Sequence, residues 1–468
     1  MDKKQIEEYM KKHEEEMISD LMVLCRIDSE KMSEKPGMPF GKGPYLALSS
    51  ALAMARGYGF KTTNYDNFAG AVDLNDQEHV LDILAHLDVV PAQEGWTETE
   101  AFKPVIKEGK IYGRGTSDDK GPAIAALYAL RAVKELGIPL KKSARLILGT
   151  NEESGSRCIA HYYEKEKEAP MTFSPDGDYP VVNIEKGRLP GDFFAGWKFS
   201  GEKPEIYSVT GGKIENAVPS SAEAILLGME ESSILPQAEQ VSEETGVNFT
   251  FEKNGEKITI AAHGVNSHAS EPEHGKNALT ALLLLLTKLP FAESSTGARL
   301  IRNLYGLMPY GETDGLHLGI RAEDEESGAL TVAFSQLTVT EGRLDGLFDC
   351  RFPIGVDADQ MLTVLTEKFK TAGLCFNGKH CSLPHYVSPD SAFVKELLSV
   401  YEDYTGLEGK CIAIGGGTYV HNLKNGVAFG AVYPGKDTHM HGADEYAVIS
   451  QLTASACMFA QVIADLCG

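Results

Sequence analysis

The stretch Gly149-Thr150-Asn151-Glu152-Glu153-Ser154-Gly155 decides the predicted architecture of this chain. It follows an apolar run, Leu146-Ile147-Leu148, that predicts a buried strand, and it ends in a Ser/Gly turn. Open parallel sheets place their chemistry at the carboxyl ends of strands. We therefore expect two adjacent carboxylates at such an end, one to bind a cation and one to move a proton. The alternative is that both glutamates only mark a helix start, where negative charge is favourable.

Length and charge limit the classes of protein that fit. The 468 residues suit two to three domains of roughly 100–200 residues each. The formal net charge of −23 argues against binding nucleic acid, whose phosphates would be repelled, and it attracts cations. We expect no membrane partner, because we find no apolar run near the roughly 18 residues that a span needs. The charged amphipathic N-terminus does not resemble a signal peptide, so we expect a cytoplasmic protein.

The eight cysteines are scattered, and none forms a Cys-x-x-Cys pair. Such spacing predicts separate reduced thiols, as is usual in the cytoplasm. The alternative is a small metal site formed by Cys375, His380 and Cys381, which lie close together in the sequence.

Polar residues follow other predicted strands in the first part of the chain. His86 and Asp88 come after a predicted strand at residues 80–85, and their spacing puts them on one face of an extended segment. Asp118 lies in a glycine-rich segment before a predicted helix, where a carboxylate could bridge two cations. Asp176 follows another short predicted strand. Such groups are hard and borderline metal ligands.

A fifth ligand candidate lies near the end of the chain. His441 would complete a set of two histidines and three carboxylates, which suits a pair of divalent ions with a shared bridge. His439 is equally compatible with the spacing alone.

The pattern of predicted elements changes twice along the chain. Residues 1–186 and 386–468 share one pattern, with helices between short apolar strands, and we expect them to form one catalytic domain. Residues 187–385 carry many β-type runs with interspersed helices, which predicts an inserted domain.

Six separated motifs now occur in one order along the chain. They are His86-Leu87-Asp88, Gly113-Arg-Gly-Thr-Ser-Asp118-Asp-Lys-Gly121, Glu152-Glu153, Ser174-Pro-Asp176, His268-Ala-Ser270 and His441-Gly-Ala-Asp-Glu445. In this combination the chain resembles the dizinc carboxypeptidase/aminoacylase-type metallopeptidases over nearly its whole length. The resemblance implies an α/β fold, with a mixed central sheet flanked by helices in the catalytic domain and an inserted α+β lid domain.

The resemblance also implies two divalent metal ions, with zinc expected and manganese or cobalt as alternatives. The implied ligands are His86 and Asp176 on one ion, Glu153 and His441 on the other, and Asp118 between the two. The family motif favours His441 over His439. It makes Glu152 the general base and Asp88 a carboxylate that supports the ligands, and it implies a cis peptide bond between Asp118 and Asp119.

Residues of the inserted domain have implied roles as well. His268 resembles the group that stabilises the tetrahedral intermediate in this family, although alone it would pass for a histidine on a surface turn. Asn216 and Arg351 resemble groups that contact the scissile carbonyl or the terminal carboxylate of the substrate. The loop with Gly416, Gly417 and Thr418 would supply backbone N–H groups to that carboxylate.

Together these features predict a metal-dependent dipeptidase that hydrolyses unblocked dipeptides with a metal-activated water and Glu152 as general base. The alternatives are an N-acyl-amino-acid deacylase or a carboxypeptidase that uses the same site. A non-catalytic metal- or peptide-binding protein would not need Glu152. We expect a small peptide as substrate. We also expect a monomer, because the long insertion could supply His268 from the same chain.

Overall fold

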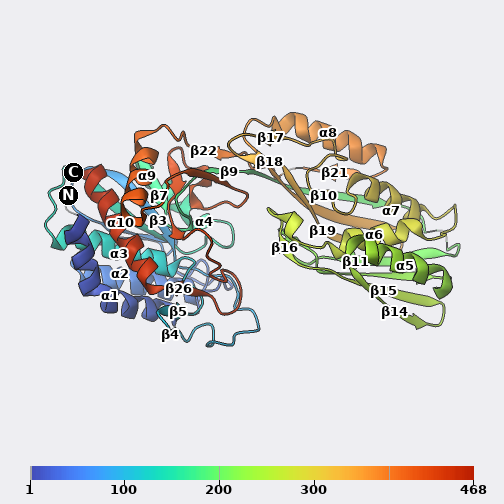
Figure 1. Ribbon diagram of the computed structural model, residues 1–468, viewed down its shortest axis with the longest axis horizontal. Helices are drawn as coiled ribbons and strands as arrows, with labels where there is room; N and C mark the ends of the chain where they lie inside the picture. Colours follow the sequence, from blue (N-terminus) through green and yellow to red (C-terminus); the bar gives the residue numbers. More distant parts are fainter. Residues whose placement is uncertain (1–2, 200, 379) are drawn as a thin grey trace. The chain divides into compact units, whose positions relative to one another are not determined.

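The computed structural model describes residues 3–199, 201–378 and 380–468. These residues separate into two compact units (Figure 1). Unit 1 extends to Ile184 and continues through Tyr386–Ile412 and Gly417–Gly468, whereas unit 2 comprises Glu185–His385 and Ala413–Gly416. The sequence division at residues 186 and 385 lies close to these bounds, but it places 413–416 in the other part.

Unit 1 and its borders contain helices and short strands in alternation. The helices are α1 (Lys3–Cys25), α2 (Lys42–Gly57), α3 (Lys120–Glu135), α4 (Arg157–Tyr163), η2 (Tyr419–Asn422), α9 (Ala392–Thr405) and α10 (Ile449–Cys467). The strands are β1 (Lys61–Tyr65), β2 (Ala69–Asp73), β3 (His79–His86), β4 (Val105–Lys107), β5 (Lys110–Tyr112), β6 (Ser143–Gly149), β7 (Met171–Ser174), β8 (Gly177–Asp178), β9 (Val181–Glu185), β22 (His385–Tyr386), β23 (Cys411–Ile414), β24 (Gly426–Ala428), β25 (Ala431–Val432) and β26 (Tyr446–Val448).

The central sheet of unit 1 is mixed. Its strand order is β1-β2-β6-β3-β7-β24-β9-β22, with β23 paired to β9. Strands β6, β3, β7 and β24 are parallel neighbours, whereas β1, β2 and β9 join in antiparallel pairs. His86 lies opposite Gly149 in the register of β3 and β6, so these two strands end at the same edge of the sheet.

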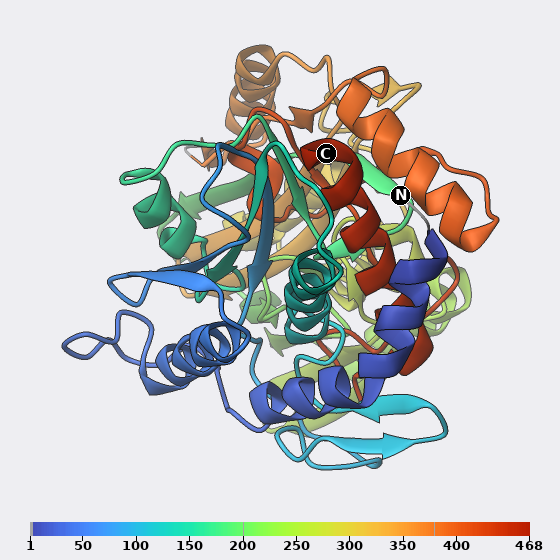
Figure 2. The same ribbon diagram turned by 90° about the vertical axis from the view of Figure 1, so that its left-hand side faces the viewer.

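The continuous apolar run of β6 explains why both faces of this sheet are covered. Leu146 and Leu148 belong to the large core on one side, and Ile147 belongs to a smaller cluster on the other. Helices α1, α3 and α10 pack against one another over the large core, as Figure 2 shows. Because strand side chains alternate between faces, a run of three apolar residues needs helices on both sides.

Helix α10 differs from the sequence expectation. Ile449–Cys467 is long and apolar enough to cross a membrane by length and composition, although no such run was expected. Its buried residues include Phe459 and Ile463, and they lie in the large core against α1 and α3. A helix that is apolar on most sides is typical of a protein core as well as of a membrane span.

Unit 2 is an antiparallel sheet with helices. Its elements are β10 (Gly187–Gly196), β11 (Glu205–Gly211), β12 (Ala217–Val218), β13 (Ser221–Leu227), α5 (Glu231–Thr245), β14 (Asn248–Asn254), β15 (Lys257–His263), β16 (Ser267–His268), η1 (Pro272–His274), α6 (Ala278–Lys288), α7 (Thr296–Leu307), β17 (Glu323–Asp324), β18 (Gly328–Ala329), β19 (Thr331–Thr340), β20 (Arg343–Phe352), α8 (Ala358–Thr371) and β21 (Cys375–Asn377). The main sheet has the order β14-β15-β13-β11-β19-β20-β10-β21.

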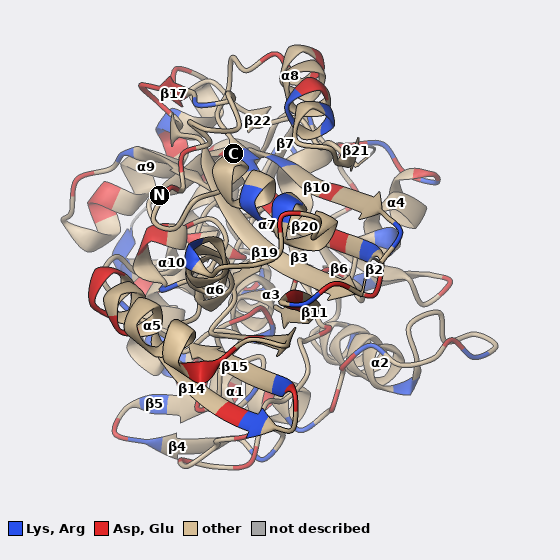
Figure 3. Ribbon diagram, turned by 90° about the vertical axis from the view of Figure 1, so that its right-hand side faces the viewer, with Lys and Arg blue, Asp and Glu red and all other residues tan. Residues whose placement is uncertain are grey.

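One face of the unit 2 sheet is apolar and buried, and the other is more exposed to solvent. Ile258, Ile260 and Ala262 alternate with more exposed residues on β15 and are buried beneath α6. Acidic and basic residues are interspersed along β14 and α8 (Figure 3). This alternation is the pattern expected for a half-buried antiparallel sheet. The predicted fold class, a mixed sheet flanked by helices with an inserted α+β domain, is confirmed.

Candidate metal centre

Three neighbouring parallel strands bring candidate ligands to one edge of the central sheet. His86 is the last residue of β3, Glu152 and Glu153 follow β6, and Asp176 follows β7. Because β3 pairs in parallel with both β6 and β7, the carboxyl ends of these strands meet. The sheet thereby places a histidine between two sources of carboxylate.

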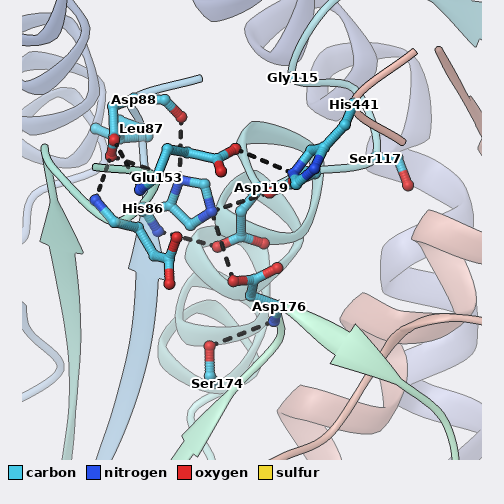
Figure 4. A network of polar contacts seen from close by, with 12 residues as sticks. His86, Leu87, Asp88, Gly115, Ser117, Asp119, Glu153, Ser174, Asp176 and His441 are labelled. Carbon is cyan, nitrogen blue, oxygen red and sulfur yellow. Dashed lines mark hydrogen bonds and ion pairs between the residues drawn. The ribbon is translucent and has the colours of Figure 1, made fainter. Parts of the chain in front are cut away.

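Two loops complete this cluster. Asp118 lies in the loop between β5 and α3, and His441 lies in the loop before β26. Figure 4 shows both loops at the cluster. Asp118 Oδ1 lies 2.9 Å from His86 Nε2, and its Oδ2 lies 2.8 Å from His441 Nε2. Asp118 therefore presents one oxygen to each histidine.

One further carboxylate flanks each histidine. Asp176 Oδ2 lies 3.6 Å from His86 Nε2, and Glu153 Oε1 lies 3.4 Å from His441 Nε2. The structure thus brings together all five predicted ligands, with Asp118 in contact with both histidines and with Glu152 also close to His86 and Asp176. Ligand atoms of His86, Asp118 and Glu153 lie within 4.8 Å of one another, as do those of His86, Glu152 and Asp176.

The side chain of Asp88 binds the backbone of both glutamates. The N–H of Glu152 donates to Asp88 Oδ1 at 2.9 Å, and the N–H of Glu153 donates to Asp88 Oδ2 at 3.2 Å. Helix α4 begins only at Arg157, so the alternative that the glutamates mark a helix start is wrong. Asp88 instead fixes the turn from which both glutamate side chains extend.

Backbone contacts also orient the ring of His86. Its Nδ1 lies 3.0 Å from the carbonyl oxygen of Asp88. With the proton on Nδ1 this contact is a hydrogen bond, and Nε2 then presents a lone pair toward Asp118, as a metal-binding histidine requires. The backbone N–H of His86 donates to Asp119 Oδ2 at 2.9 Å. The peptide bond between Asp118 and Asp119 is cis, as the family resemblance implied.

Burial and mutual repulsion shift the pKa values of the acidic groups of the cluster. Burial raises the pKa of Glu152 well above its usual value, and the neighbouring Asp176 carboxylate raises it further. Burial, followed by the charge of Asp118, raises the pKa of Glu153 to about 7. Burial alone would raise the pKa of Asp118, but His441 and His86 lower it below its ordinary range. Without cations, the cluster is short of positive charge.

In the two histidines, burial lowers the pKa and the neighbouring carboxylates raise it. Burial lowers the pKa of His441, but Asp118 and Glu153 outweigh it and raise that pKa to about 11. Burial also lowers the pKa of His86, and Asp118 and Asp176 together raise it well above the ordinary value. Both rings are therefore held where a positive charge is favourable.

Unsatisfied buried atoms show that the cluster fits metal ions. His86 Nε2, Asp118 Oδ1 and Glu153 Oε1 are buried and lack a well-formed hydrogen bond to any described residue; their short contacts are those between His86 and Asp118 and between His441 and Glu153. Buried polar atoms without a hydrogen bond are rare, and their presence points to a bound ion or water. Imidazole nitrogen and carboxylate oxygen are ligands that zinc and similar divalent ions accept. The donor set therefore suits two such ions with Asp118 between them.

The other metal-site alternatives are not supported by the geometry. The His439 ring packs edge-on against Tyr446, with the ring centroids 5.8 Å apart, whereas His441 faces Asp118 and Glu153. All eight cysteines are free thiols. Within the described residues, the groups that could hold a metal ion contain no cysteine.

Two of the predicted substrate-contacting residues of unit 2 lie side by side. Strand β16 pairs with β12, and His268 is opposite Ala217, the neighbour of Asn216. His268 Nε2 lies 3.4 Å from Asn216 Nδ2. His268 Nδ1 lies 2.6 Å from Ser270 Oγ, a partner that the motif reading did not single out. The ring of His268 is exposed.

Arg351 is already engaged inside unit 2. Its guanidinium binds both carboxylate oxygens of Asp349, through Nε at 2.5 Å and Nη2 at 3.2 Å, and its Nη1 donates to Gly415 O at 2.6 Å. The opposite charges two residues apart on β20 were a signal for this pair. Gly416 belongs to unit 2, whereas Gly417 and Thr418 belong to unit 1.

The fold and this cluster of histidines and carboxylates are those of a metallopeptidase. Residues 83–465 match the model of peptidase family M20/M25/M40. The chain belongs to this family, and the predicted family is thereby confirmed.

Proteins of similar sequence and structure support the assignment. YtjP of Bacillus subtilis (strain 168) is 36% identical over 458 residues, which are 97% of each chain. A Beta-Ala-Xaa dipeptidase from Lactobacillus delbrueckii subsp. lactis is 34% identical over 456 residues, or 96% of each chain. The fold is shared with human carnosine dipeptidase 1, with a TM-score of 0.61, 15% identity, and coverage of 99% of this chain and 98% of that chain. It is also shared with the di-peptidase Dug1p of Saccharomyces cerevisiae, with a TM-score of 0.59, 14% identity and 99% coverage of both chains.

Proposed function

We propose that this protein is a metal-dependent dipeptidase that hydrolyses the peptide bond of unblocked dipeptides. The observation that carries the proposal is the position of Asp118, with one oxygen toward each of two histidines. His86, Asp118 and Asp176 would hold one divalent ion, and Asp118, Glu153 and His441 would hold the other. Zinc is the expected metal, with manganese or cobalt as alternatives. The 34% identical relative that bears the name Beta-Ala-Xaa dipeptidase supports a dipeptide as substrate.

Divalent ions bound in such a pair lower the pKa of a nearby water and polarise the peptide carbonyl. Glu152 is free to move the proton, because Asp88 binds its backbone N–H and leaves its side chain available. Its carboxylate accepts a proton from the attacking water and returns it to the nitrogen of the leaving amine.

Residues of unit 2 are proposed to bind the substrate. His268 would donate a hydrogen bond to the developing oxyanion, and Asn216 lies beside it as a donor for the same carbonyl. Arg351 and the backbone N–H groups of Gly416, Gly417 and Thr418 would bind the terminal carboxylate of the peptide. Because the guanidinium of Arg351 contacts Asp349 and Gly415, Arg351 also fixes the start of this glycine-rich loop. In this proposal unit 2 acts as the lid domain.

We also expect a cytoplasmic monomer. Eight free thiols are typical of a reducing compartment. The insertion could supply His268 from the same chain, and in that case a second subunit is not needed for a complete set of residues. Sedimentation velocity of the purified protein should give the mass of one chain at all concentrations, and an obligate dimer would contradict this expectation.

The proposed function is tested by metal content and hydrolysis measured on the same preparation. Mass spectrometry should find about two divalent ions per chain, as in other two-metal hydrolases. A small panel of unblocked dipeptides should be hydrolysed, with activity lost on chelation and restored by added metal.

Each other result has a defined meaning. Two ions with cleavage only of N-acylated amino acids would favour the deacylase alternative, and cleavage of longer peptides from the carboxyl end would favour a carboxypeptidase. Absence of bound metal, with no effect of added metal, would refute the reading of the cluster.

A further inference from the structure

A buried ion pair beside the loops of Asp118 and His441 has no role in the proposed mechanism. Arg114 and Glu445 are fully enclosed, with side-chain exposures of 1% and 0%, and Arg114 Nη1 donates to Glu445 Oε2 at 2.6 Å. Burying two charges is costly unless their remaining donors and acceptors are satisfied. The other contacts of this pair therefore indicate what it does.

Glu445 binds the loop that carries Asp118. Its Oε1 accepts hydrogen bonds from the backbone N–H groups of Gly115 at 3.0 Å, Ser117 at 2.9 Å and Asp118 at 3.3 Å. Three amides of one short loop thus converge on a single oxygen of a residue more than 300 positions away in the sequence. This arrangement fixes the path of the backbone just before the shared ligand.

Arg114 binds the loop that carries His441. Its Nη2 donates to the carbonyl oxygens of His441 at 3.3 Å and Gly442 at 3.0 Å. His441 has a φ of 63°, in the left-handed region that a residue with a side chain rarely adopts. A buried, doubly donating guanidinium is a group that can hold such a backbone in place.

The two contacts are crossed. Arg114 belongs to the Asp118 loop and binds the His441 loop, whereas Glu445 belongs to the His441 loop and binds the Asp118 loop. The side chains of Asp118 and His441 then meet at 2.8 Å. We propose that this Arg114–Glu445 clasp is a positioning element that sets the distance between Asp118 and His441 and thereby the affinity for the ion shared by Asp118, Glu153 and His441. The inference rests on the proposed two-metal site.

The clasp predicts unequal effects on the two ions. His86 and Asp176 are placed by strands β3 and β7, so their ion depends on the clasp through Asp118 alone. The ion held by His441 depends on both loops. Loss of the clasp should therefore weaken one ion more than the other, which a general loss of stability would not do.

The test is a zinc titration of metal-depleted protein in competition with a chromophoric chelator. Arg114→Lys keeps the charge opposite Glu445 but loses the fork that reaches His441 O and Gly442 O, and Glu445→Gln removes the charge that gathers the three amides. In both variants the affinity for one of two zinc ions should fall about 10- to 100-fold, the range typical for residues that orient ligands. The other ion should be affected less.

A matched control is Arg145→Lys. Arg145 Nε donates to Asp73 Oδ1 at 2.6 Å in another largely buried pair of unit 1, near the start of β6 and not at the carboxyl end that leads to the glutamates. This variant should lose stability but keep the affinity of both ions. Equal zinc binding by the folded clasp variants and the wild type would overturn the clasp and leave the proposed function standing. Failure of the wild-type protein to bind zinc would overturn both.

A measurement on the wild-type protein keeps the inference testable if the variants do not fold. In metal-depleted protein, the amides of Gly115, Ser117 and Asp118 should be protected from hydrogen exchange, because Glu445 binds them without the metal. Rapid exchange at these three amides before zinc is added would overturn the inference.

Discussion

Replacing Asp88 by asparagine tests how the glutamate pair is held. Asp88 uses both of its oxygens, one for the N–H of Glu152 and one for the N–H of Glu153. Asparagine has the same shape but offers one oxygen and one NH₂ group. One of the two amides would then lose its acceptor and face a donor instead. The side chains of the general base and of one metal ligand should shift as a consequence.

The size of the effect follows from these two hydrogen bonds. A hydrogen bond to a charged acceptor contributes about 1.5–3 kcal/mol, and a buried donor left unsatisfied costs about 1–3 kcal/mol. These two contributions overlap. We therefore expect the substitution to remove about 2–4 kcal/mol of the free energy that stabilises the turn with Glu152 and Glu153. If the same loss appears in the transition state, kcat/KM falls by roughly 30- to 1000-fold, since about 1.4 kcal/mol corresponds to a factor of ten.

The assay is kcat/KM for one dipeptide, with the zinc content of the same samples. Asp82→Asn is the matched control, because Asp82 is also buried but lies within β3, where its Oδ2 accepts one backbone N–H, that of Ala169 at 3.3 Å, and its Oδ1 lies 3.4 Å from His79 Nε2. Asparagine can keep the bond from Ala169 N–H and removes only the charge opposite His79, which lies at the start of β3, so activity should be preserved. The reasoning is refuted if Asp88→Asn keeps kcat/KM within about tenfold of wild type, or if both variants lose activity equally.

Two other substitutions separate chemistry from metal binding. Glu152→Gln should keep two zinc ions and lose about 10²- to 10⁴-fold in kcat, as is typical for a general base, and activity within about tenfold, or ~1.4 kcal/mol of barrier, would remove Glu152 from this role. His268→Ala should lower kcat by about 10²- to 10³-fold, the usual effect of removing an oxyanion donor. Its zinc content should be unchanged, and a parallel loss of zinc would instead argue for a role in the metal site.

The strand ends could be read from the sequence because their signals are local. The uninterrupted apolar run before Glu152 indicates a strand buried on both faces, and the spacing of His86 and Asp88 matches the two-residue repeat of a strand. The parallel pairing of β3 with β6 and β7 then brings these ends together. The motif order identified the family, and hence the fold, for the same reason, since each motif lies at an element end.

Contacts between distant loops could not be read in this way. Nothing near Asp118 in the sequence indicates that His441 Nε2 lies 2.8 Å away, because the two loops are joined by tertiary contacts alone. The spacing alone left His439 and His441 equivalent; the family motif favoured His441, and in the structure it is the His441 ring that faces Asp118. The burial of α10 likewise comes from its packing against α1 and α3, which are distant in the sequence.

The hydrogen bonds of the buried acidic residues distinguish expected ligands from supporting residues, which residue type alone does not. Glu445 and Asp88 are acidic, buried and close to ligands, but both oxygens of each already accept hydrogen bonds from protein groups. Asp118 Oδ1 and Glu153 Oε1 are buried, accept no hydrogen bond from a backbone N–H or an arginine of the described residues, and face only the ring nitrogens of His86 and His441. A cation gains most where the oxygen has no other donor, because no existing hydrogen bond must be broken. We therefore expect Glu445 and Asp88 to orient the site, and Asp118 and Glu153 to bind metal.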